Sequence, residues 1–172
     1  MAKSSRRAHK TSHQSEKPSA VVNRRASFDY ELSDNLIVGL QLTGAEVKAA
    51  RTGRVNLRGA YVTSRENLRH QAELYLINAS FSLNTNTPKN SGQNQTAVDT
   101  RARKILAKRR EIDRLVAAKI SGLTIVPTKL LPTGRYIKLV VALGRGKKKY
   151  DKREAIRRRD QVRDNAKFLK HL

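Results

Sequence analysis

The sequence contains no cysteine and no long run of apolar residues. Without cysteine the chain can form neither disulfides nor thiolate metal sites. No stretch approaches the roughly 20 apolar residues that a membrane-spanning helix needs. The opening residues, MAKSSRRAHK, also lack the apolar segment of a secretory signal. We therefore expect a protein that acts in the cytoplasm and does not associate with a membrane.

Acidic residues are also scarce: 14 Asp and Glu stand against 37 Lys and Arg, and the net charge is +23. Such self-repulsion destabilises a compact state unless an anionic partner neutralises it. Nucleic acid is the first candidate, because Lys and Arg that bind phosphates release condensed counterions. Aromatic residues make up only 5% of the chain, too few for a broad stacking platform. Recognition should therefore depend mostly on the backbone and shape of a folded RNA.

Residues that could support catalysis are sparse. None of the four histidines lies with another at zinc-ligand spacing near a carboxylate. Gly144-Arg145-Gly146-Lys147 lacks the first glycine of a phosphate-binding loop. Glu46, Glu111 and Asp113 are interpreted as capping or ion-pairing residues, because none forms an acidic pair isolated from Arg and Lys. We expect no enzymatic activity, no metal site and no cofactor.

The chain divides into three regions by composition. Residues 1–22 are rich in Ser, Lys and His, have no apolar period, and are predicted to form a disordered basic arm. An ordered domain is expected over residues 23–146, with a mobile Asn/Gln-rich loop at 84–96. Residues 147–172 form a basic tail.

Hydrophobic patterns within the ordered domain favour a mainly β fold with helices. Strands are predicted at 28–32 and 36–42, joined by a turn, and further extended stretches at 55–57, 60–63, 74–77, 123–131 and 136–143. A helix should begin at Thr43-Gly44-Ala45-Glu46, which has capping-box spacing, and end at Gly53. A second helical region should extend from Ile105 to Ile120 and end at Gly122. This pattern suggests a small barrel of the oligonucleotide-binding (OB) kind.

The tail has helix-forming residues but few apolar ones. Its like-charge pairs, such as Arg153 with Arg157, each cost about 0.2–0.5 kcal/mol, and the pair of Glu154 with Arg158 offsets a similar amount. An isolated helix of this length is marginal in water. We therefore expect the tail to be disordered when free and helical once phosphates neutralise its charge.

Basic residues gather at 23–25, at 101–110 and in the tail. Any one of these clusters could be a solvated surface, but three of them on a chain of this charge favour RNA or DNA binding. A basic ribosomal or ribosome-associated protein remains an alternative interpretation.

Several segments match a known family in order and in spacing, over residues 23–160. They are Asn23-Arg24-Arg25-Ala26, Asp29-Tyr30, Gly44-Ala45-Glu46-Val47-Lys48, Gly53-Arg54-Val55-Asn56-Leu57, Ala60-Tyr61-Val62, Arg101-Ala102-Arg103-Lys104-Ile105-Leu106, Arg110-Glu111-Ile112, Gly122-Leu123-Thr124-Ile125-Val126-Pro127 and Gly146-Lys147-Lys148-Lys149-Tyr150-Asp151-Lys152-Arg153. On these motifs the chain resembles the SsrA-binding protein family, also called small protein B, whose RNA partner acts in bacterial trans-translation.

The resemblance implies a six-stranded antiparallel OB-like barrel with about three short helices. It implies a monomer that binds the tRNA-like domain of transfer-messenger RNA and brings it to ribosomes stalled on truncated messages. Elongation factor Tu and alanyl-tRNA synthetase would be partners only indirectly, through the RNA. The tail would occupy the decoding centre of the small subunit and the empty message channel, in contact with ribosomal RNA.

The resemblance also implies two sets of site residues. The set expected to bind transfer-messenger RNA is Asn23, Arg24, Arg25, Glu46, Lys48, Arg54, Asn56, Arg101, Arg103, Lys104, Leu106 and Lys108. The set expected to bind the ribosome is Lys147, Lys148, Lys149, Tyr150, Asp151, Lys152, Arg153, Phe168 and Leu169. Leu106 could instead belong to the core. The chain departs from the family at Ile37, where an acidic residue is usual, and at Lys108, where Asn or His is common.

Overall fold

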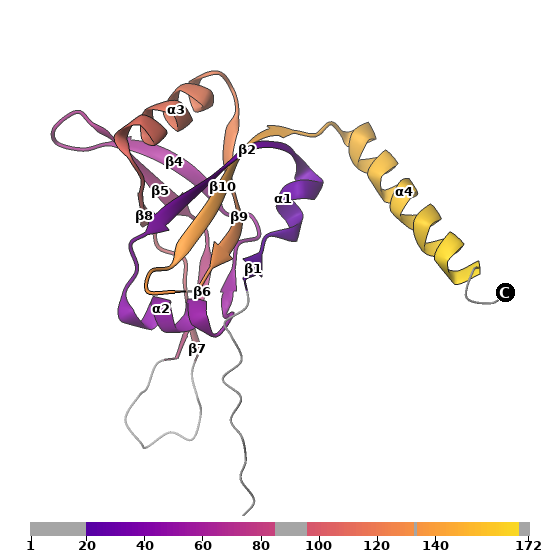
Figure 1. Cartoon of the computed structure of the whole chain (residues 1–172), viewed down its shortest axis with the longest axis horizontal. Helices are drawn as coiled ribbons and strands as arrows, with labels where there is room; N and C mark the ends of the chain where they lie inside the picture. Colours follow the sequence, from indigo (N-terminus) through magenta and orange to yellow (C-terminus); the bar gives the residue numbers. More distant parts are fainter. Residues whose placement is uncertain (1–19, 85–95, 133, 169–172) are drawn as a thin grey trace, which may run out of the picture.

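The computed structural model describes residues 20–84, 96–132 and 134–168 (Figure 1). Most of the predicted arm at 1–22, most of the predicted loop at 84–96, and Leu169 lie outside these ranges. The fold is mainly antiparallel β-sheet with a few short helices.

Seven strands form the main sheet. Their spatial order is β1(Val21–Val22), β9(Thr124–Leu131), β10(Lys138–Gly146), β2(Tyr30–Leu40), β8(Arg103–Leu106), β5(Ala72–Ile77) and β4(Tyr61–Glu66). Because β4 also pairs with β9, through Val62 and Ile125, six of these strands close into a ring. A second sheet contains β3(Val55–Asn56), β6(Ser80–Asn84) and β7(Thr96–Asp99).

The core fills the inside of this ring. Side chains alternate between the two faces of a strand, so Leu74 and Leu76 of β5, Ile105 of β8, and Leu139 and Val141 of β10 all point inward and are buried. Fully burying a side chain of this kind stabilises the fold by about 1.5–3 kcal/mol. The residues between them point outward, to the outer surface of the ring.

The short helices lie around the sheets (Figure 1). Asn23 caps α1(Arg24–Asp29): its Oδ1 accepts from the Ala26 amide at 3.3 Å. Glu46 accepts from the amide of Thr43 at 2.7 Å at the start of α2(Gly44–Arg51), as the capping-box spacing predicts. The chain leaves α2 through Gly53, whose φ of 70° suits glycine. The remaining helices are α3(Arg109–Ile120) and α4(Lys149–Phe168).

The predicted pair of strands at 28–32 and 36–42 is wrong. Helix α1 continues to Asp29, and a single strand, β2, then extends from Tyr30 to Leu40. Opposite β2 the register of β10 shifts between Val141 and Leu143, and Asp34 takes a φ of 47°. The polar segment expected to form a turn is therefore a bulge that the strand absorbs.

The predicted helix from Ile105 to Ile120 begins later than expected. Ile105 lies on β8, paired with Leu40 of β2 and Leu74 of β5, and α3 begins at Arg109. Strands β6 and β7 were not predicted as separate elements. Short apolar runs of this kind do not distinguish helix from strand by periodicity alone.

The tail is helical over 20 residues in α4, so the predicted disorder of the free tail is not confirmed. Ion pairs among the described side chains of α4 include Arg158 with Glu154 at 2.9 Å and Arg163 with Asp160 at 2.6 Å. Among the described residues, no helix combines the length and the apolar character needed to cross a membrane.

Candidate nucleic-acid interface

Three adjoining hollows lie on the outside of the main sheet. The first, the α1 hollow, is bordered by Arg24, Arg25 and Asn56, among others, and extends to Ile37. The second lies between Ile37 and Leu106, and the third continues from Leu106 to Lys104. Because Ile37 and Leu106 each line two hollows, the three form one continuous surface, which we call the outer groove.

Leu106 lies near the middle of the outer groove. Its side chain is 51% exposed, so the alternative that it belongs to the core is excluded. It stands over Gly39 of the neighbouring strand, where an added Cβ would lie 3.2 Å from the Leu106 Cβ. Ile37, 57% exposed, also lies on this surface. An exposed apolar pair among cations can support the bases or sugars of an RNA while the cations bind phosphates.

Cations border the outer groove on several sides. Arg135 and Lys138 line the second hollow, and Lys104 and Arg109 line the third. Lys104 forms an ion pair with Glu73 at 2.7 Å. Hydrogen bonds from Lys104, Tyr75 and Asn67 lower the pKa of Glu73 to about 2, so this carboxylate is charged at neutral pH and holds the Lys104 ammonium in place.

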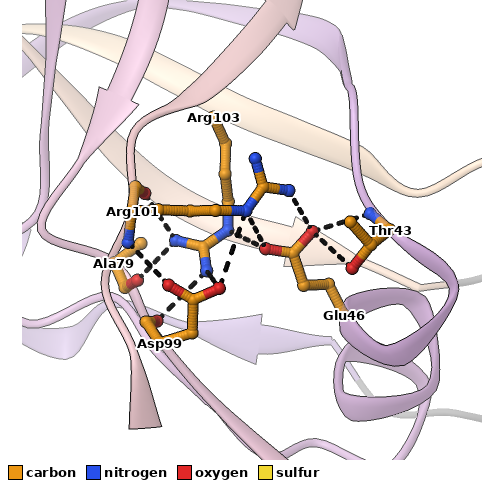
Figure 2. A network of polar contacts seen from close by, with 6 residues as sticks. All are labelled: Thr43, Glu46, Ala79, Asp99, Arg101 and Arg103. Atoms are coloured by element: carbon orange, nitrogen blue, oxygen red, sulfur yellow. Dashed lines mark hydrogen bonds and ion pairs between the residues drawn. The ribbon is translucent and has the colours of Figure 1, made fainter.

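A buried polar network lies inside the fold beneath β8 (Figure 2). Glu46 of α2 accepts from Arg103 Nε at 2.8 Å and from Arg101 Nε at 2.9 Å. Arg103 also donates to the carbonyl of Ala79 at 2.9 Å. Its guanidinium lies 4.0 Å from the centroid of the Phe81 ring, a favourable cation–π geometry.

The charges in this network depend on one another. Burial alone would raise the pKa of Glu46, but hydrogen bonds from Arg101 and Thr43 and the charge of Arg103 outweigh it and lower the pKa. Burial lowers the pKa of Arg103, opposed by the adjacent Glu46 carboxylate. Each charge is therefore stable inside the protein only because its partners are present.

The predicted RNA-binding residues fall into three groups. Arg24, Arg25, Asn56, Lys104 and Leu106 line the outer groove. Lys48 and Lys108 are exposed but do not line the outer groove. Arg54 also lies outside the groove and is half-buried, with its Nε 3.1 Å from Thr52 Oγ1. Asn23, Glu46, Arg101 and Arg103 are engaged in internal contacts.

Asn23, Glu46 and Arg103 are buried and so offer little surface for direct contact with RNA, although Asn23 also lines the α1 hollow. Asn23 is almost fully buried, and its side-chain amide donates to the carbonyls of Leu57 and Pro127, both at 2.9 Å. The side chains of Glu46 and Arg103 are 0% exposed. Arg101, 45% exposed, is the one member of the Glu46 ion pairs with a large accessible surface.

Some residues that line the outer groove were not predicted from the sequence. They include Arg58 and Lys129 in the α1 hollow and Arg135, Tyr136 and Lys138 in the second hollow. The alternation along β10 could have identified Lys138 as outward-facing. Arg58 and Arg135 lie in connections between strands, where no periodic signal exists.

The predicted ribosome-binding residues lie at the end of β10 and in α4. Tyr150 and Arg153 are exposed, while Lys147 and Lys152 contact α1. Asp151 accepts from the amide of Lys148 at 3.0 Å and so caps the start of α4. The side chains of Lys149 and Phe168 lie outside what the structure describes, as does Leu169. Within the described residues, no group of three or more His, Cys, Asp or Glu could hold a metal ion.

Comparison with known proteins gives consistent matches. A family model described as "SmpB protein" matches residues 20–171. The SsrA-binding protein of a Nostoc species is 40% identical over 151 residues, covering 87% of this chain and 91% of that protein. The SsrA-binding protein of Gloeobacter violaceus is 41% identical over 145 residues, covering 84% and 89%.

A chain from a solved structure described as "tmRNA-SmpB: a journey to the center of the bacterial ribosome" is also similar. It is 33% identical, with a TM-score of 0.55, and the match covers 81% of this chain and 95% of that chain.

Proposed function

The chain belongs to the SsrA-binding protein (SmpB) family, and from this premise we infer that it is an adaptor that binds transfer-messenger RNA and acts with it on the ribosome in trans-translation. The relatives named SsrA-binding protein and the similarity to the tmRNA–SmpB structure both support this function. Its net charge of +23 suits two RNA partners.

We propose that the outer groove binds the tRNA-like domain of transfer-messenger RNA. The observation that supports this most directly is the exposure of Leu106 at the junction of two hollows, with Lys104 on one side and Lys138 on the other. Arg24, Arg25 and Asn56 would extend the contact along the α1 hollow. Lys48, Arg54, Arg101 and Lys108 would contact phosphates beyond the rim of the groove.

Replacing Leu106 by Ala tests this proposal. The change should weaken binding of the tRNA-like domain roughly fivefold, because about 1 kcal/mol is expected when RNA covers a half-exposed Leu side chain. Thermal stability should change little, as for other surface substitutions. The matched control is Ile120→Ala, since Ile120 is an exposed apolar residue of α3 that lines none of the three hollows.

Titration of labelled RNA measures the affinity of each variant, and thermal melts of the same samples measure its stability. Equal affinities for Leu106→Ala and Ile120→Ala would remove the outer groove from the RNA interface. A loss of about 2–5 kcal/mol in the stability of Leu106→Ala, the cost of truncating a core residue, would contradict the exposed position of Leu106.

We assign the buried network an organising role. Glu46 connects α2 to the segment that contains Arg101 and to strand β8. It thereby fixes Lys48 on the outside of α2 relative to Lys104 and Leu106 on the outside of β8. On this proposal Glu46 and Arg103 affect RNA binding through the position of their neighbours and do not touch the RNA.

The remaining features of the proposal follow the family resemblance. The closed ring of six strands would act as an OB-like barrel over residues 23–146, and the tail from residue 147 would enter the decoding centre and the message channel. Elongation factor Tu and alanyl-tRNA synthetase would act through the RNA. The protein would function as a monomer in the cytoplasm, without catalytic activity of its own.

A further inference from the structure

Asp29, the last residue of α1, contacts the root of the C-terminal tail in two ways. Its backbone carbonyl accepts from the amide of Lys147 at 2.9 Å. Its carboxylate accepts from Lys152 Nζ, in the first turns of α4, at 2.9 Å through Oδ1. A single residue therefore contacts both the link between β10 and α4, at Lys147, and the start of α4, at Lys152.

Neighbouring contacts support the same junction. Arg25 Nε donates to the other carboxylate oxygen of Asp29 at 2.7 Å, which orients that carboxylate from within α1. Lys147 Nζ donates to the carbonyl of Ser27 at 2.9 Å. The strand pairing of Tyr30 with Gly146 continues directly into these contacts. The hydrogen bond from Lys152 is the largest cause that lowers the pKa of Asp29, so the carboxylate is ionised at neutral pH.

Beyond this junction α4 projects away from the sheets (Figure 1). A small rotation at its root therefore moves the far end of a 20-residue helix by a large distance. Contacts at the root decide the direction of the whole helix.

We propose that Asp29 is a positioning residue for the tail, because it holds the first turns of α4 against α1 and sets the direction in which α4 leaves the body. This inference deepens the proposed function and depends on the role of the tail in the ribosome given there. Asp29 itself does not contact RNA. It acts through Lys147 and Lys152.

A distance measurement between body and tail tests the proposal without any RNA. The chain has no cysteine, so spin labels can be attached only at Ala117→Cys on α3 and Gln161→Cys on α4, both exposed. Pulsed electron paramagnetic resonance of the full chain should give a narrow distance distribution for the parent. Asp29→Asn should broaden it, with the helix content by circular dichroism largely unchanged.

Two further variants make this result specific. Asp34→Asn is the matched control, since Asp34 lies on β2 and pairs with Arg114 of α3 at 3.1 Å, away from the tail. It should leave the distribution narrow. Lys152→Gln changes the tail and leaves the body unaltered, yet it should broaden the distance distribution as Asp29→Asn does. The double variant should be little broader than either single variant, because both remove the same contact. An unchanged distribution in both single variants would overturn the proposal.

The functional measurement is tagging of purified ribosomes stalled on a truncated message. Asp29→Asn should reduce the tagging rate roughly threefold to tenfold, which is the effect of weakening a partly exposed charged hydrogen bond. The affinity of this variant for the isolated tRNA-like domain should stay within about twofold of the parent. Normal tagging by a variant with a broadened distribution would also overturn the proposal. A parent protein that neither bound the RNA nor supported tagging would refute the proposed function instead, and the distance measurement would still decide the role of Asp29.

Discussion

Arg103→Ala should destabilise the protein strongly and leave its surface charge pattern on β8 intact. Arg103 is fully buried and donates to Glu46, to the carbonyls of Ala79 and Arg101, and to that of Asp99. Truncation removes all four contacts and leaves the buried Glu46 carboxylate with Arg101 as its remaining ion-pair partner.

Breaking a buried ion pair from one side costs about 3–5 kcal/mol, because the remaining charge loses its compensation. The substitution also removes the cation–π contact between the Arg103 guanidinium and the Phe81 ring. For a domain of 150–250 residues each kcal/mol lowers the melting temperature by about 2–4 °C. We therefore expect a decrease of roughly 10 °C or more.

The matched variant is Lys104→Ala, one residue along the strand. Lys104 points outward, where its ion pair with Glu73 is partly exposed to solvent and adds little to stability. If Lys104 binds a phosphate as we propose, its removal should lower the slope of log affinity against log salt by about 0.7–0.9. Calorimetry should therefore show a large loss of stability for Arg103→Ala and a small one for Lys104→Ala. Salt-dependent RNA titrations should show a reduced slope for Lys104→Ala and not for Arg103→Ala. A stable Arg103→Ala protein with a flattened salt dependence would show that Arg103 reaches the RNA and would refute the assignment.

Two other predictions concern the tail and pH. A chain that ends at Gly146 should keep most of its affinity for transfer-messenger RNA but lose tagging. Part of the loss would come from the stacking on a base that we propose for Tyr150, a kind of contact worth about 1–3 kcal/mol. An equal loss of affinity and of tagging would make the tail a simple electrostatic anchor. The depressed pKa of Glu73, about 2 against a usual 4.5, means that its pairing with Lys104 stabilises the protein above pH 4.5 and that this contribution disappears as the pH falls towards 2. Urea melts between pH 2 and 5 should therefore show a weaker pH dependence in Glu73→Gln, and identical curves would contradict the shift.

Features with a local signal could be predicted from the sequence. The capping-box spacing from Thr43 to Glu46 and the glycine at position 53 correctly located α2. The two apolar runs on either side of Pro132 correctly predicted the adjacent strands β9 and β10. In each case the residues that determine the element lie within a few positions of one another, so that propensity and turn chemistry are sufficient.

The orientation of β8 could not be predicted in this way. Its pairing with β2 and β5 joins residues far apart in the chain, such as Ile105 with Leu40 and with Leu74. Without that pairing, the run from Arg101 to Lys108 can be recognised only as a basic cluster with no assigned inner or outer face. As a strand, it divides into Arg103 and Ile105 inside and Lys104 and Leu106 outside. The same limit applies to Asp29, whose partner Lys152 lies 123 positions away.

This alternation gives one four-residue strand two separate roles. The inward Arg103 connects β8 to Glu46 and thus to α2, while the outward Lys104 and Leu106 form part of the outer groove. Replacing Arg103 and Lys104 together would therefore combine a loss of stability with a loss of charge. Any decrease in RNA affinity could then arise from unfolding alone. Single substitutions, each measured for both stability and salt dependence, separate the two roles because the side chains point to opposite faces of the same strand.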